Sequence, residues 1–272
     1  LVVEQDVKVP EHITVLKVDN SRVALAELAA AWYGHPAEKL TTIGVTGTKG
    51  KTTTTYMIRG ILEKAGLPTG LIGTIEAIIG DKHIPSLNTT PESFLVQKYF
   101  AEMVQAGIRY VVMEVSSQAL KYHRTLCTRF AAACFLNIGL DHISPIEHPD
   151  FEDYFSSKLR IFAQAEVGCV NLDCEHAGRV LAAAQAGSRQ VITFSQKDPE
   201  ADIYASQVRK RGNDILFRVR SRRFSREFRL TMPGLFNVEN ALAAIAVCEG
   251  LNIPERAVYV GLMKARVPGR ME

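Results

Sequence analysis

A glycine-rich turn near the start of the chain has the residue types that bind phosphate. In the stretch IGVTGTKGKTTTT, which begins at Ile43, an apolar run leads into a turn with two glycines, a lysine and four threonines. Gly47 and Gly50 remove the Cβ atoms that would obstruct backbone N–H groups converging at a helix start. Lys51 can reach the β- and γ-phosphates of a nucleotide, and Thr52 can present its hydroxyl to Mg²⁺. The turn therefore predicts a nucleotide site of the P-loop type.

The general P-loop pattern is only partly met. It requires a glycine five residues before Gly50, where this chain has Val45, and Gly44 lies one position away. The alternative is a purely structural glycine turn, followed by a helix that starts with β-branched residues. Because threonine is a poor helix former, four threonines in a row favour the phosphate-binding interpretation.

A lysine in the second half of the chain lies among aromatic residues at helical spacing. Lys158 comes three residues after Phe155 and four before Phe162, so it shares their helix face and points inward. Burial lowers the pKa of a lysine, and a neutral amine can add CO₂ to become an anionic, metal-binding carbamate. The alternative is an ammonium that extends along the rings to water. Periodicity alone slightly favours this alternative.

Further candidates follow apolar strands or lie on a helix. Glu114 ends the run YVVMEV and His142 follows the run CFLNI. Both are candidates for an active site because the carboxyl ends of parallel strands face the ligand crevice. The alternatives are a solvated carboxylate and a structural histidine. Asn237 and Asn240, three residues apart, could read the edge of a base, or they are a helix cap and a surface amide.

Strand and helix patterns alternate along most of the chain. Two short strands are predicted at 1–4 and 12–18, followed by a helix at 21–34 that is capped by Asn20 or Ser21. From Thr41, apolar runs predict strands at 41–47, 110–117, 131–139, 167–172 and 191–195. Helices are predicted at 51–65, 91–107 (with Pro91 in the first turn), 150–165, 175–186, 236–251 and 254–265. This alternation predicts an α/β fold of the P-loop NTPase type, a mostly parallel sheet with flanking helices.

Residues 203–231 have a different pattern, in which apolar and basic residues alternate. This period of two predicts a small antiparallel β subregion with one solvated face. The arginines at 209–229 raise the hypothesis of a nucleic-acid binder. The solvated face is favoured over that hypothesis, because no array of aromatic residues accompanies the arginines.

Composition limits the classes of protein that fit. The 272 residues are 47% hydrophobic and 22% charged, with a net charge of +3 that gives no general attraction to nucleic acid. Five cysteines without CxxC or zinc spacing fit a reducing compartment. The sequence has no apolar stretch of the ~18–20 residues that cross a bilayer and no signal-peptide pattern. We therefore expect a cytoplasmic protein without membrane insertion.

Several motifs together resemble the Mur ligase family. The turn TGTKGKTTT is similar to that family's nucleotide loop, usually TGTNGKT followed by Thr or Ser, with Lys49 in place of the usual Asn. Further matches are NTTPES (88–93), MEVSSQALKYHR (113–124), NIGLDHI (137–143), the lysine of YFSSKLRIF, FNVENALAA (236–244) and the closing PGRME. They indicate the branch that adds the third residue to UDP-MurNAc-L-Ala-D-Glu.

The resemblance also implies how the chain divides. Residues 1–39 are similar to the end of an N-terminal UDP-binding domain with its linker, and 40–267 to the central ATP-binding domain. Residues 268–272 are similar to the first residues of a C-terminal ligase domain. Because the chain starts without Met inside a strand-like run and stops without a closing element, we expect a fragment of a longer protein.

The resemblance also implies which residues bind each ligand. ATP is expected at Gly47, Thr48, Lys49, Gly50, Lys51, Thr52, Thr53, Asn237 and Asn240. Two Mg²⁺ ions are expected at Thr52, Glu114, His142 and a carbamylated Lys158. Mg²⁺ prefers oxygen ligands, so the histidine depends on the resemblance alone. The UDP-MurNAc-dipeptide is expected at Thr89, Thr90, Ser116 and Arg124. The expected catalytic set is Lys51, Glu114, His142 and Lys158.

The activity that the resemblance implies is ATP-dependent formation of an amide bond through an acyl phosphate. The expected partners are small molecules, the UDP-MurNAc-dipeptide and an amino acid, and the expected state is a monomer. The amino acid, L-lysine or meso-diaminopimelate, is left open. The fragment alone is expected to bind nucleotide and to be a poor ligase, since the part that seats the amino acid is missing.

Two alternative functions share part of this motif set. Folylpolyglutamate synthase and cyanophycin synthetase are related ligases, but the former continues its loop as GKGS where this chain has GKTT, and NTTPES is out of place there. The other alternative is a nucleotide-binding module without catalysis. The joint presence of Lys51, Thr52, Glu114, His142 and Lys158 argues against such a module.

Overall fold

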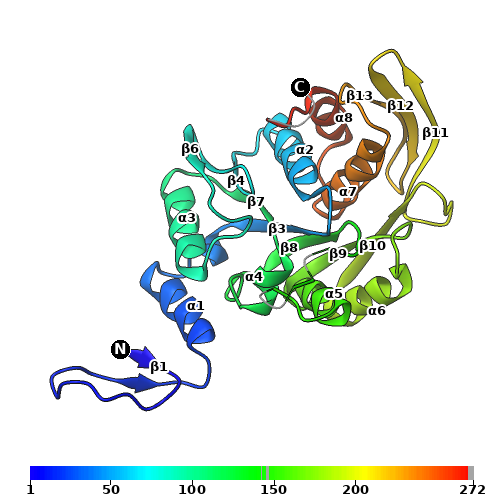
Figure 1. Cartoon of the computed structure of the whole chain (residues 1–272). Helices are drawn as coiled ribbons and strands as arrows, with labels where there is room; N and C mark the ends of the chain where they lie inside the picture. The colour runs from blue at the N-terminus through cyan, green and yellow to red at the C-terminus, as the bar shows by residue number, and fades with distance from the viewer. Residues whose placement is uncertain (142, 145–146, 269–272) are drawn as a thin grey trace.

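The computed structural model describes residues 1–141, 143–144 and 147–268. The strands of its central sheet are β3 (Thr41–Thr46), β4 (Thr69–Ile72), β5 (Glu76–Ile79), β6 (Lys82–Pro85), β7 (Tyr110–Glu114), β8 (Phe130–Phe135), β9 (Ala165–Asn171), β10 (Gln190–Ser195), β11 (Ile203–Arg211), β12 (Asp214–Arg220) and β13 (Ser225–Leu230). In the described residues they form one 11-stranded sheet with the order β13-β12-β11-β10-β9-β8-β3-β7-β4-β5-β6 (Figure 1). Neighbours from β11 to β4 pair in parallel, and the outer strands on both edges pair antiparallel.

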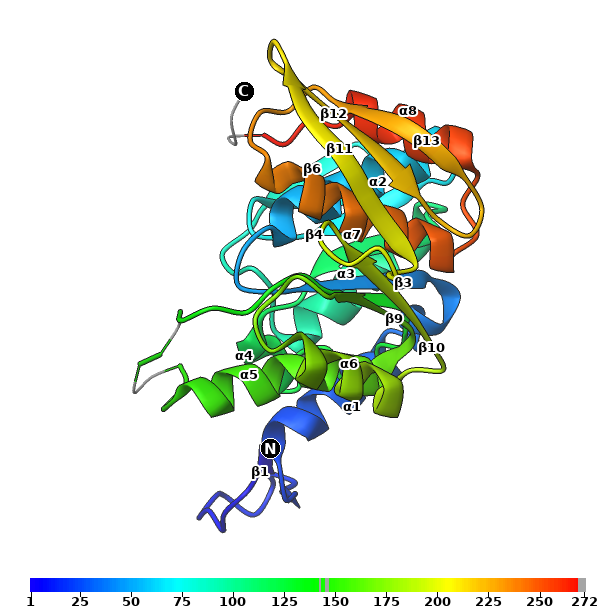
Figure 2. The ribbon, with the colours of Figure 1, turned by 90° about the vertical axis from the view of Figure 1, so that its right-hand side faces the viewer.

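Helices cover both faces of this sheet. They are α1 (Ser21–Trp32), α2 (Lys51–Lys64), α3 (Ser93–Gln105), α4 (Ser117–Lys121), α5 (Phe151–Leu159), α6 (Ala177–Gly187), α7 (Phe236–Gly250) and α8 (Glu255–Lys264), with 3₁₀ turns η1 (Pro36–Lys39) and η2 (Arg160–Gln164). Figures 1 and 2 show α2, α7 and α8 on one side of the sheet and α3, α5 and α6 on the other. Each side buries its own apolar cluster, so the sheet is covered twice, as parallel sheets require.

The order of the strands creates a switch point at the centre of the sheet. β3 lies between β7 and β8. From β3 the chain runs outward through β4, β5 and β6 to one edge, and then returns to β7 and crosses to β8 on the other side of β3. At such a point the loops that follow adjacent strands separate and leave a crevice at their carboxyl ends. The glycine-rich turn follows β3, Glu114 ends β7, and the segment with Asn137 follows β8. The fold therefore brings these three segments to the same edge.

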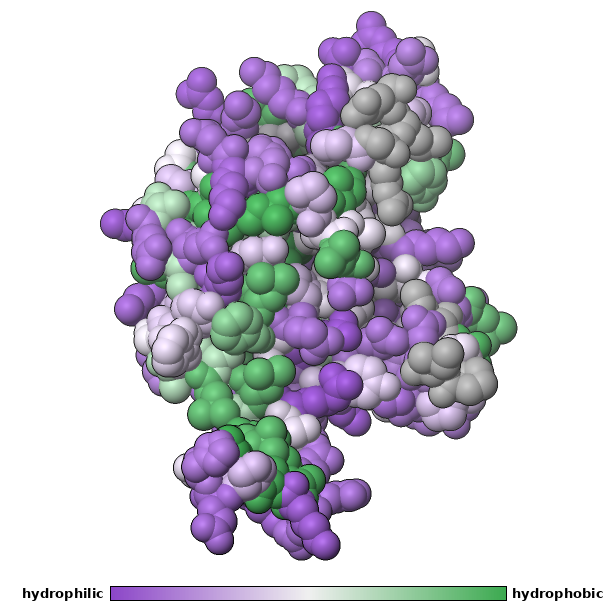
Figure 3. All heavy atoms as spheres, turned by 60° about the vertical axis from the view of Figure 1, so that its left-hand side comes forward, coloured by the Kyte–Doolittle hydropathy of each residue, from purple (hydrophilic) through white to green (hydrophobic). Residues whose placement is uncertain are grey.

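The N-terminal segment projects from the body of the molecule (Figure 1). β1 (Val2–Val3) and β2 (Leu16–Lys17) pair in parallel, and Asn20 caps α1 by accepting hydrogen bonds from the N–H groups of Arg22 (2.9 Å) and Val23 (3.1 Å). On α1, Leu28 and Trp32 are 52% and 80% exposed. Figure 3 shows apolar side chains gathered on this side of the molecule, above the N-terminal projection.

Most of the predicted elements are confirmed, with shifts at their ends. Asn20 is the cap of α1, and α2 ends at Lys64 before Gly66, as predicted. α3 begins at Ser93 with Glu92 as its N-cap, so the prediction that Pro91 lies in the first turn is wrong. The predicted helix 150–165 is α5 followed by the 3₁₀ turn η2.

The remaining differences concern short elements. β4, β5, β6 and α4 were not predicted, because each has only four or five residues. The antiparallel strands β11 to β13 are confirmed, and they continue the main sheet. In the described part of the chain, the structure contains no helix with the length and apolar character needed to span a bilayer.

Candidate active site

The turn between β3 and α2 needs glycine at two positions. Gly50 has φ +87°, and a Cβ there would lie 2.3 Å from Oδ1 of Asn240. Gly47 has φ +152°, and its Cβ would lie 2.9 Å from Cβ of Leu136. Both positions combine a left-handed φ with close neighbours, so a side chain at either one would displace the turn. This conformation presents the start of α2 to the crevice, as a phosphate-binding loop does.

The residues after the turn are held by side-chain hydrogen bonds. Nζ of Lys51 donates to the carbonyl oxygens of Gly47 (2.9 Å) and Thr48 (3.2 Å), so the amine lies back across the turn. Thr52 donates from Oγ1 to Oε2 of Glu114 at 3.1 Å, and Thr54 is 3.4 Å from Oδ1 of Asn240. The threonines that follow Lys51 are buried in α2. They connect the turn to β7 and α7, which accounts for a run of poor helix formers at this position.

Glu114 is a buried carboxylate, 1% exposed, at the end of β7. Besides the Thr52 hydroxyl, it accepts hydrogen bonds from the backbone N–H (2.9 Å) and the hydroxyl (3.0 Å) of Thr74. Thr74, which lies in the loop between the unpredicted strands β4 and β5, was not predicted as a site residue. Carboxylate and hydroxyl oxygens side by side are the ligands that Mg²⁺ prefers.

Lys158 lies on the inward helix face that its spacing predicts, and its amine is buried, as the resemblance implies. Its side chain is 2% exposed, its Nζ donates to the carbonyl oxygen of Gly47 (3.1 Å), and it lies 4.7 Å from the ring centroid of Tyr154. Burial, followed by the positive charge of Lys51, lowers the pKa of Lys158 well below its usual value, and Asp141 acts in the opposite direction. The alternative of an ammonium that extends to water is therefore wrong.

The segment after β8 is tied to the glycine-rich turn. Asn137 accepts from the backbone N–H of Lys49 (2.9 Å) and donates to its carbonyl oxygen (3.1 Å). The hydroxyl of Thr48 accepts from the N–H of Gly139 (3.1 Å) and lies 3.0 Å from the hydroxyl of Tyr154. Asn137 and Tyr154 were not predicted as site residues, although Asn137 opens the motif NIGLDHI. His142, in the same motif, lies outside the described residues.

Both predicted asparagines of α7 are buried beside the turn. Asn237 is 2% exposed and Asn240 is 6% exposed, and Nδ2 of Asn240 donates to Oδ1 of Asn237 at 3.0 Å. Nδ2 of Asn237 donates to the carbonyl oxygen of Pro233 (2.7 Å). The N-cap of α7 is Leu235, so the alternative of a helix cap and a surface amide is wrong.

These segments enclose a cavity of about 1300 Å³. It is lined by Thr48, Lys49, Gly50, Lys51, Thr52, Thr53, Thr74, Glu114, Asn137, Ile138, Gly139, Leu140, Met232, Phe236, Asn237, Glu239 and Asn240. One end of the cavity has the hydroxyls and the carboxylate around Glu114, and α7 provides an aromatic ring and amides. The polar end suits the phosphates of a nucleotide, and the end with an aromatic ring and amides suits its base.

The four residues predicted to bind the dipeptide substrate lie near Glu114 but outside that cavity. Thr90 is buried and donates to the carbonyl oxygen of Glu114 (2.8 Å), and its hydroxyl accepts from the N–H of Ser116 (3.0 Å). Arg124 donates to the carbonyl oxygen of Thr90 at 3.1 Å. The hydroxyl of Thr89 accepts from that of Thr74 at 3.1 Å. The structure thus gathers Thr89, Thr90, Ser116 and Arg124 around the end of β7.

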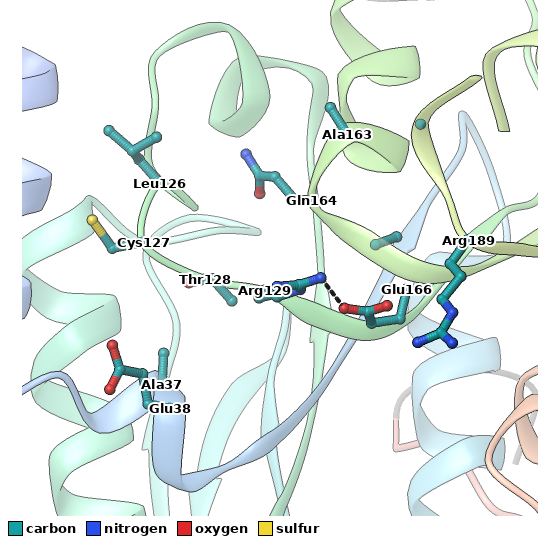
Figure 4. A pocket seen from close by; sticks show the side chains of 12 residues that line it. Ala37, Glu38, Leu126, Cys127, Thr128, Arg129, Ala163, Gln164, Glu166 and Arg189 are labelled. Carbon is teal, nitrogen blue, oxygen red and sulfur yellow. Dashed lines mark ion pairs between the residues drawn. The ribbon is translucent and has the colours of Figure 1, made fainter. Parts of the chain in front are cut away.

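A second cavity, of about 800 Å³, lies at the other end of the sheet, where β8 and β9 begin (Figure 4). An ion pair between Arg129 and Glu166 crosses it, and Cys127, Thr128 and Arg189 also line it. None of the predicted site residues lines this cavity.

Four of the eight arginines at 209–229 form ion pairs with carboxylates. Ion pairs connect Arg222 with Asp202 (2.6 Å), Arg226 with Glu255 (3.0 Å), Arg229 with Asp214 (2.6 Å), and Arg209 with Glu227 (2.5 Å). Pairing reduces the positive field that would attract a nucleic acid. The solvated-face interpretation of this segment is favoured.

Comparisons with known proteins identify the family of the chain. Residues 45–248 match the family description Mur ligase middle domain. Two curated relatives are named UDP-N-acetylmuramoyl-L-alanyl-D-glutamate--2,6-diaminopimelate ligase. The relative from Clostridium perfringens (strain 13 / Type A) is 37% identical over 100% of this chain and 56% of its own length. The one from Clostridium tetani (strain Massachusetts / E88) is 41% identical over 96% and 53%.

A solved structure of a ligase with the same name superimposes with a TM-score of 0.90 at 25% identity. The match covers 100% of this chain and 55% of that one. The chain therefore spans about half the length of the curated relatives it matches. On the family match, which covers most of the sequence, the chain belongs to the Mur ligase family, and it carries the middle domain of that family.

Proposed function

We propose that this chain is the nucleotide-binding part of a ligase that uses ATP to add the third amino acid to UDP-MurNAc-L-Ala-D-Glu. The observation that carries the proposal is the convergence of Lys51, Thr52 and Glu114 on one cavity, with the buried Lys158 bonded to the turn beside it. The names of the relatives support 2,6-diaminopimelate as the added amino acid.

The residues present fit a bound nucleotide. The turn presents the start of α2, and Lys51 provides an amine that can move from the carbonyl oxygens of the turn to the phosphates. Lys49 adds a further exposed amine to the wall of the cavity. Asn237 and Asn240 are placed to read adenine, since their amides carry both donors and acceptors.

The residues also fit Mg²⁺. Thr52 and Glu114 would hold one ion through hard oxygen atoms. A carbamylated Lys158, together with His142, would hold a second ion. The lowered pKa of Lys158 favours the neutral amine that adds CO₂, and the resulting anion would be compensated by Lys51. When bound, the two ions neutralise phosphate charge and so favour phosphoryl transfer.

In the proposed reaction, a carboxylate oxygen of the D-Glu residue attacks the γ-phosphorus of ATP. The bond from that phosphorus to the ADP oxygen breaks, and an acyl phosphate forms. The amine of the incoming amino acid then attacks the acyl carbon, and phosphate leaves as the amide forms. Lys51 holds the triphosphate in line for the first step, and its charge stabilises the equatorial oxygens.

The remaining assignments are part of the same proposal. Thr89, Thr90, Ser116 and Arg124 would bind the muramoyl-dipeptide next to Glu114. The chain would contain parts of three successive domains, at residues 1–39, 40–267 and 268–272. The exposed apolar side chains of α1 support this division, because they leave a surface on which the rest of the first domain could pack. Of the last range, residues 269–272 lie outside the described residues. The protein would act in the cytoplasm as a monomer.

A ligation assay tests this proposal. The full-length protein that contains this chain is expected to convert UDP-MurNAc-L-Ala-D-Glu to the tripeptide with meso-diaminopimelate and ATP, and to release phosphate. L-Lysine is expected to be the poorer substrate. The 272-residue chain alone is expected to give little product. Normal turnover by the isolated chain, or phosphate release without tripeptide from the full-length protein, would contradict the proposal.

A further inference from the structure

The wall of the 1300 Å³ cavity contains a second acidic side chain besides Glu114. Glu239 lies in the first turn of α7, between Asn237 and Asn240, and lines the cavity. Its Oε1 accepts a hydrogen bond from Nδ2 of Asn171, which also donates to the carbonyl oxygen of Leu136 at 2.8 Å. Asn171 is fully buried at the end of β9. The carboxylate of Glu239 is therefore fixed above the carboxyl ends of β8 and β9.

This position is on the opposite side of the turn from Glu114. The strand order is β9-β8-β3-β7, with the turn after β3 and Glu114 at the end of β7. Neighbouring strands are about 4.8 Å apart, so the ends of β7 and β9 are separated by roughly 14 Å. If the terminal phosphate lies near Glu114 and Thr52, the nucleoside of the same molecule lies near Glu239.

Glu239 is a partly buried carboxylate. Burial raises its pKa and the hydrogen bond from Asn171 lowers it, while the charges of Asp173 and Lys197 have smaller and opposite effects. Among the described residues, no ion pair to Glu239 is found, and Asn171 provides the one hydrogen bond to its carboxylate. A carboxylate in such surroundings costs stability unless a ligand satisfies it, so it marks a functional position.

The ligand group that suits this carboxylate is a pair of hydroxyls. An ionised carboxylate only accepts hydrogen bonds, and its two oxygen atoms match two neighbouring O–H donors. The amides of Asn237 and Asn240 already provide donors and acceptors for a base. We propose that Glu239 binds the ribose of the nucleotide by accepting hydrogen bonds from its 2′- and 3′-hydroxyls. This inference rests on the nucleotide site of the proposed function.

Calorimetric titrations of the 272-residue chain test the inference. The probes are the Mg²⁺ complexes of ATP, 2′-deoxy-ATP, 3′-deoxy-ATP and ITP, which lacks the 6-amino group. The unaltered protein is expected to bind ATP about tenfold more tightly than at least one deoxy analogue, since a hydrogen bond to a charged group contributes that much. Glu239→Ala is expected to abolish this preference, and Glu239→Gln to weaken it. The ratio of ATP to ITP affinity is expected to stay the same in both variants.

Glu249→Gln is the matched control. Glu249 is in the same helix, burial also raises its pKa, and it does not line the cavity. This variant should keep the preference for ribose. The ribose assignment is wrong if Glu239→Ala and Glu239→Gln both keep the preference for ATP over the deoxy analogues. It is also wrong if these variants change the ratio of ATP to ITP affinity and leave that preference intact. If the unaltered protein binds no Mg·ATP, the proposed nucleotide site fails, and the inference fails with it.

Discussion

Lys158 places a titratable amine in the interior next to the phosphate-binding turn. Its lowered pKa means that, between that pKa and the ordinary lysine pKa, the unfolded chain binds more protons than the folded chain. The stability of the protein should therefore increase as the pH rises through this interval. Lys158→Met removes the amine at nearly the same volume, so it should remove this component of the pH dependence.

The measurement is the free energy of unfolding from urea titrations at several pH values, in buffers free of CO₂. As the pH rises, the free energy of unfolding of the unaltered protein should increase relative to that of Lys158→Met. Lys64→Met, at the exposed end of α2, controls for the loss of a lysine elsewhere. Parallel pH profiles for the unaltered protein and Lys158→Met would show that Lys158 is not perturbed.

At the scale of single residues, local pattern predicted a large part of the site. Spacing placed Lys158 on the helix face of the aromatic residues, the family resemblance favoured a buried amine, and strand-end position predicted Glu114. Thr74, Tyr154 and Glu239 were not predicted, because their contacts join segments far apart in the sequence. The bond from Asn171 to Glu239, for example, spans 68 residues, and no local pattern records it.

The connection between β3 and α2 is the element on which the site depends. Gly50→Ala would place a Cβ 2.3 Å from Oδ1 of Asn240 and force φ +87° on an alanine. The expected result is an affinity for Mg·ATP that is lower by about tenfold or more, because the turn and Asn240 must both move. The affinity is measured by calorimetry on folded protein.

Gly66→Ala is the control for that substitution. Gly66 has a similar φ, +76°, but a Cβ there meets no atom within 4 Å. Gly66→Ala should lower the free energy of unfolding by about 1 kcal/mol, because alanine disfavours a left-handed backbone. It should leave the affinity for nucleotide unchanged. Equal affinities of the two variants for Mg·ATP would count against a tight turn as the phosphate site.

At the scale of elements, the long periodic segments were predictable and the short ones were not. α2 and α7 have 14 and 15 residues, so the signal of one helix face repeats over several turns. α4 has 5 residues, and it is held by the capping hydroxyl of Ser116 and by packing against α5, which periodicity does not register. β4, β5 and β6 have 4 residues each and depend on pairing with β7 and with one another.

At the scale of the whole molecule, the order of the strands is a property that neither single residues nor single elements specify. Sequence alternation predicted a mostly parallel sheet, and the structure and its relatives confirm that fold. The position of β3 between β7 and β8 depends on long-range pairing. That position decides that the turn, Glu114 and the segment after β8 meet at one edge. The second cavity lies at the opposite end of the same strands (Figure 4).

The most direct test of the account is a calorimetric titration of this chain with Mg·ATP, compared with Lys51→Met. We predict heat of binding at one nucleotide per chain for the unaltered protein, and an affinity lower by about tenfold or more for the variant, because a charged contact to the phosphates is lost. Absence of binding heat from the unaltered protein over a range of temperatures, or equal affinity in Lys51→Met, would contradict the assignment of the turn as the phosphate site.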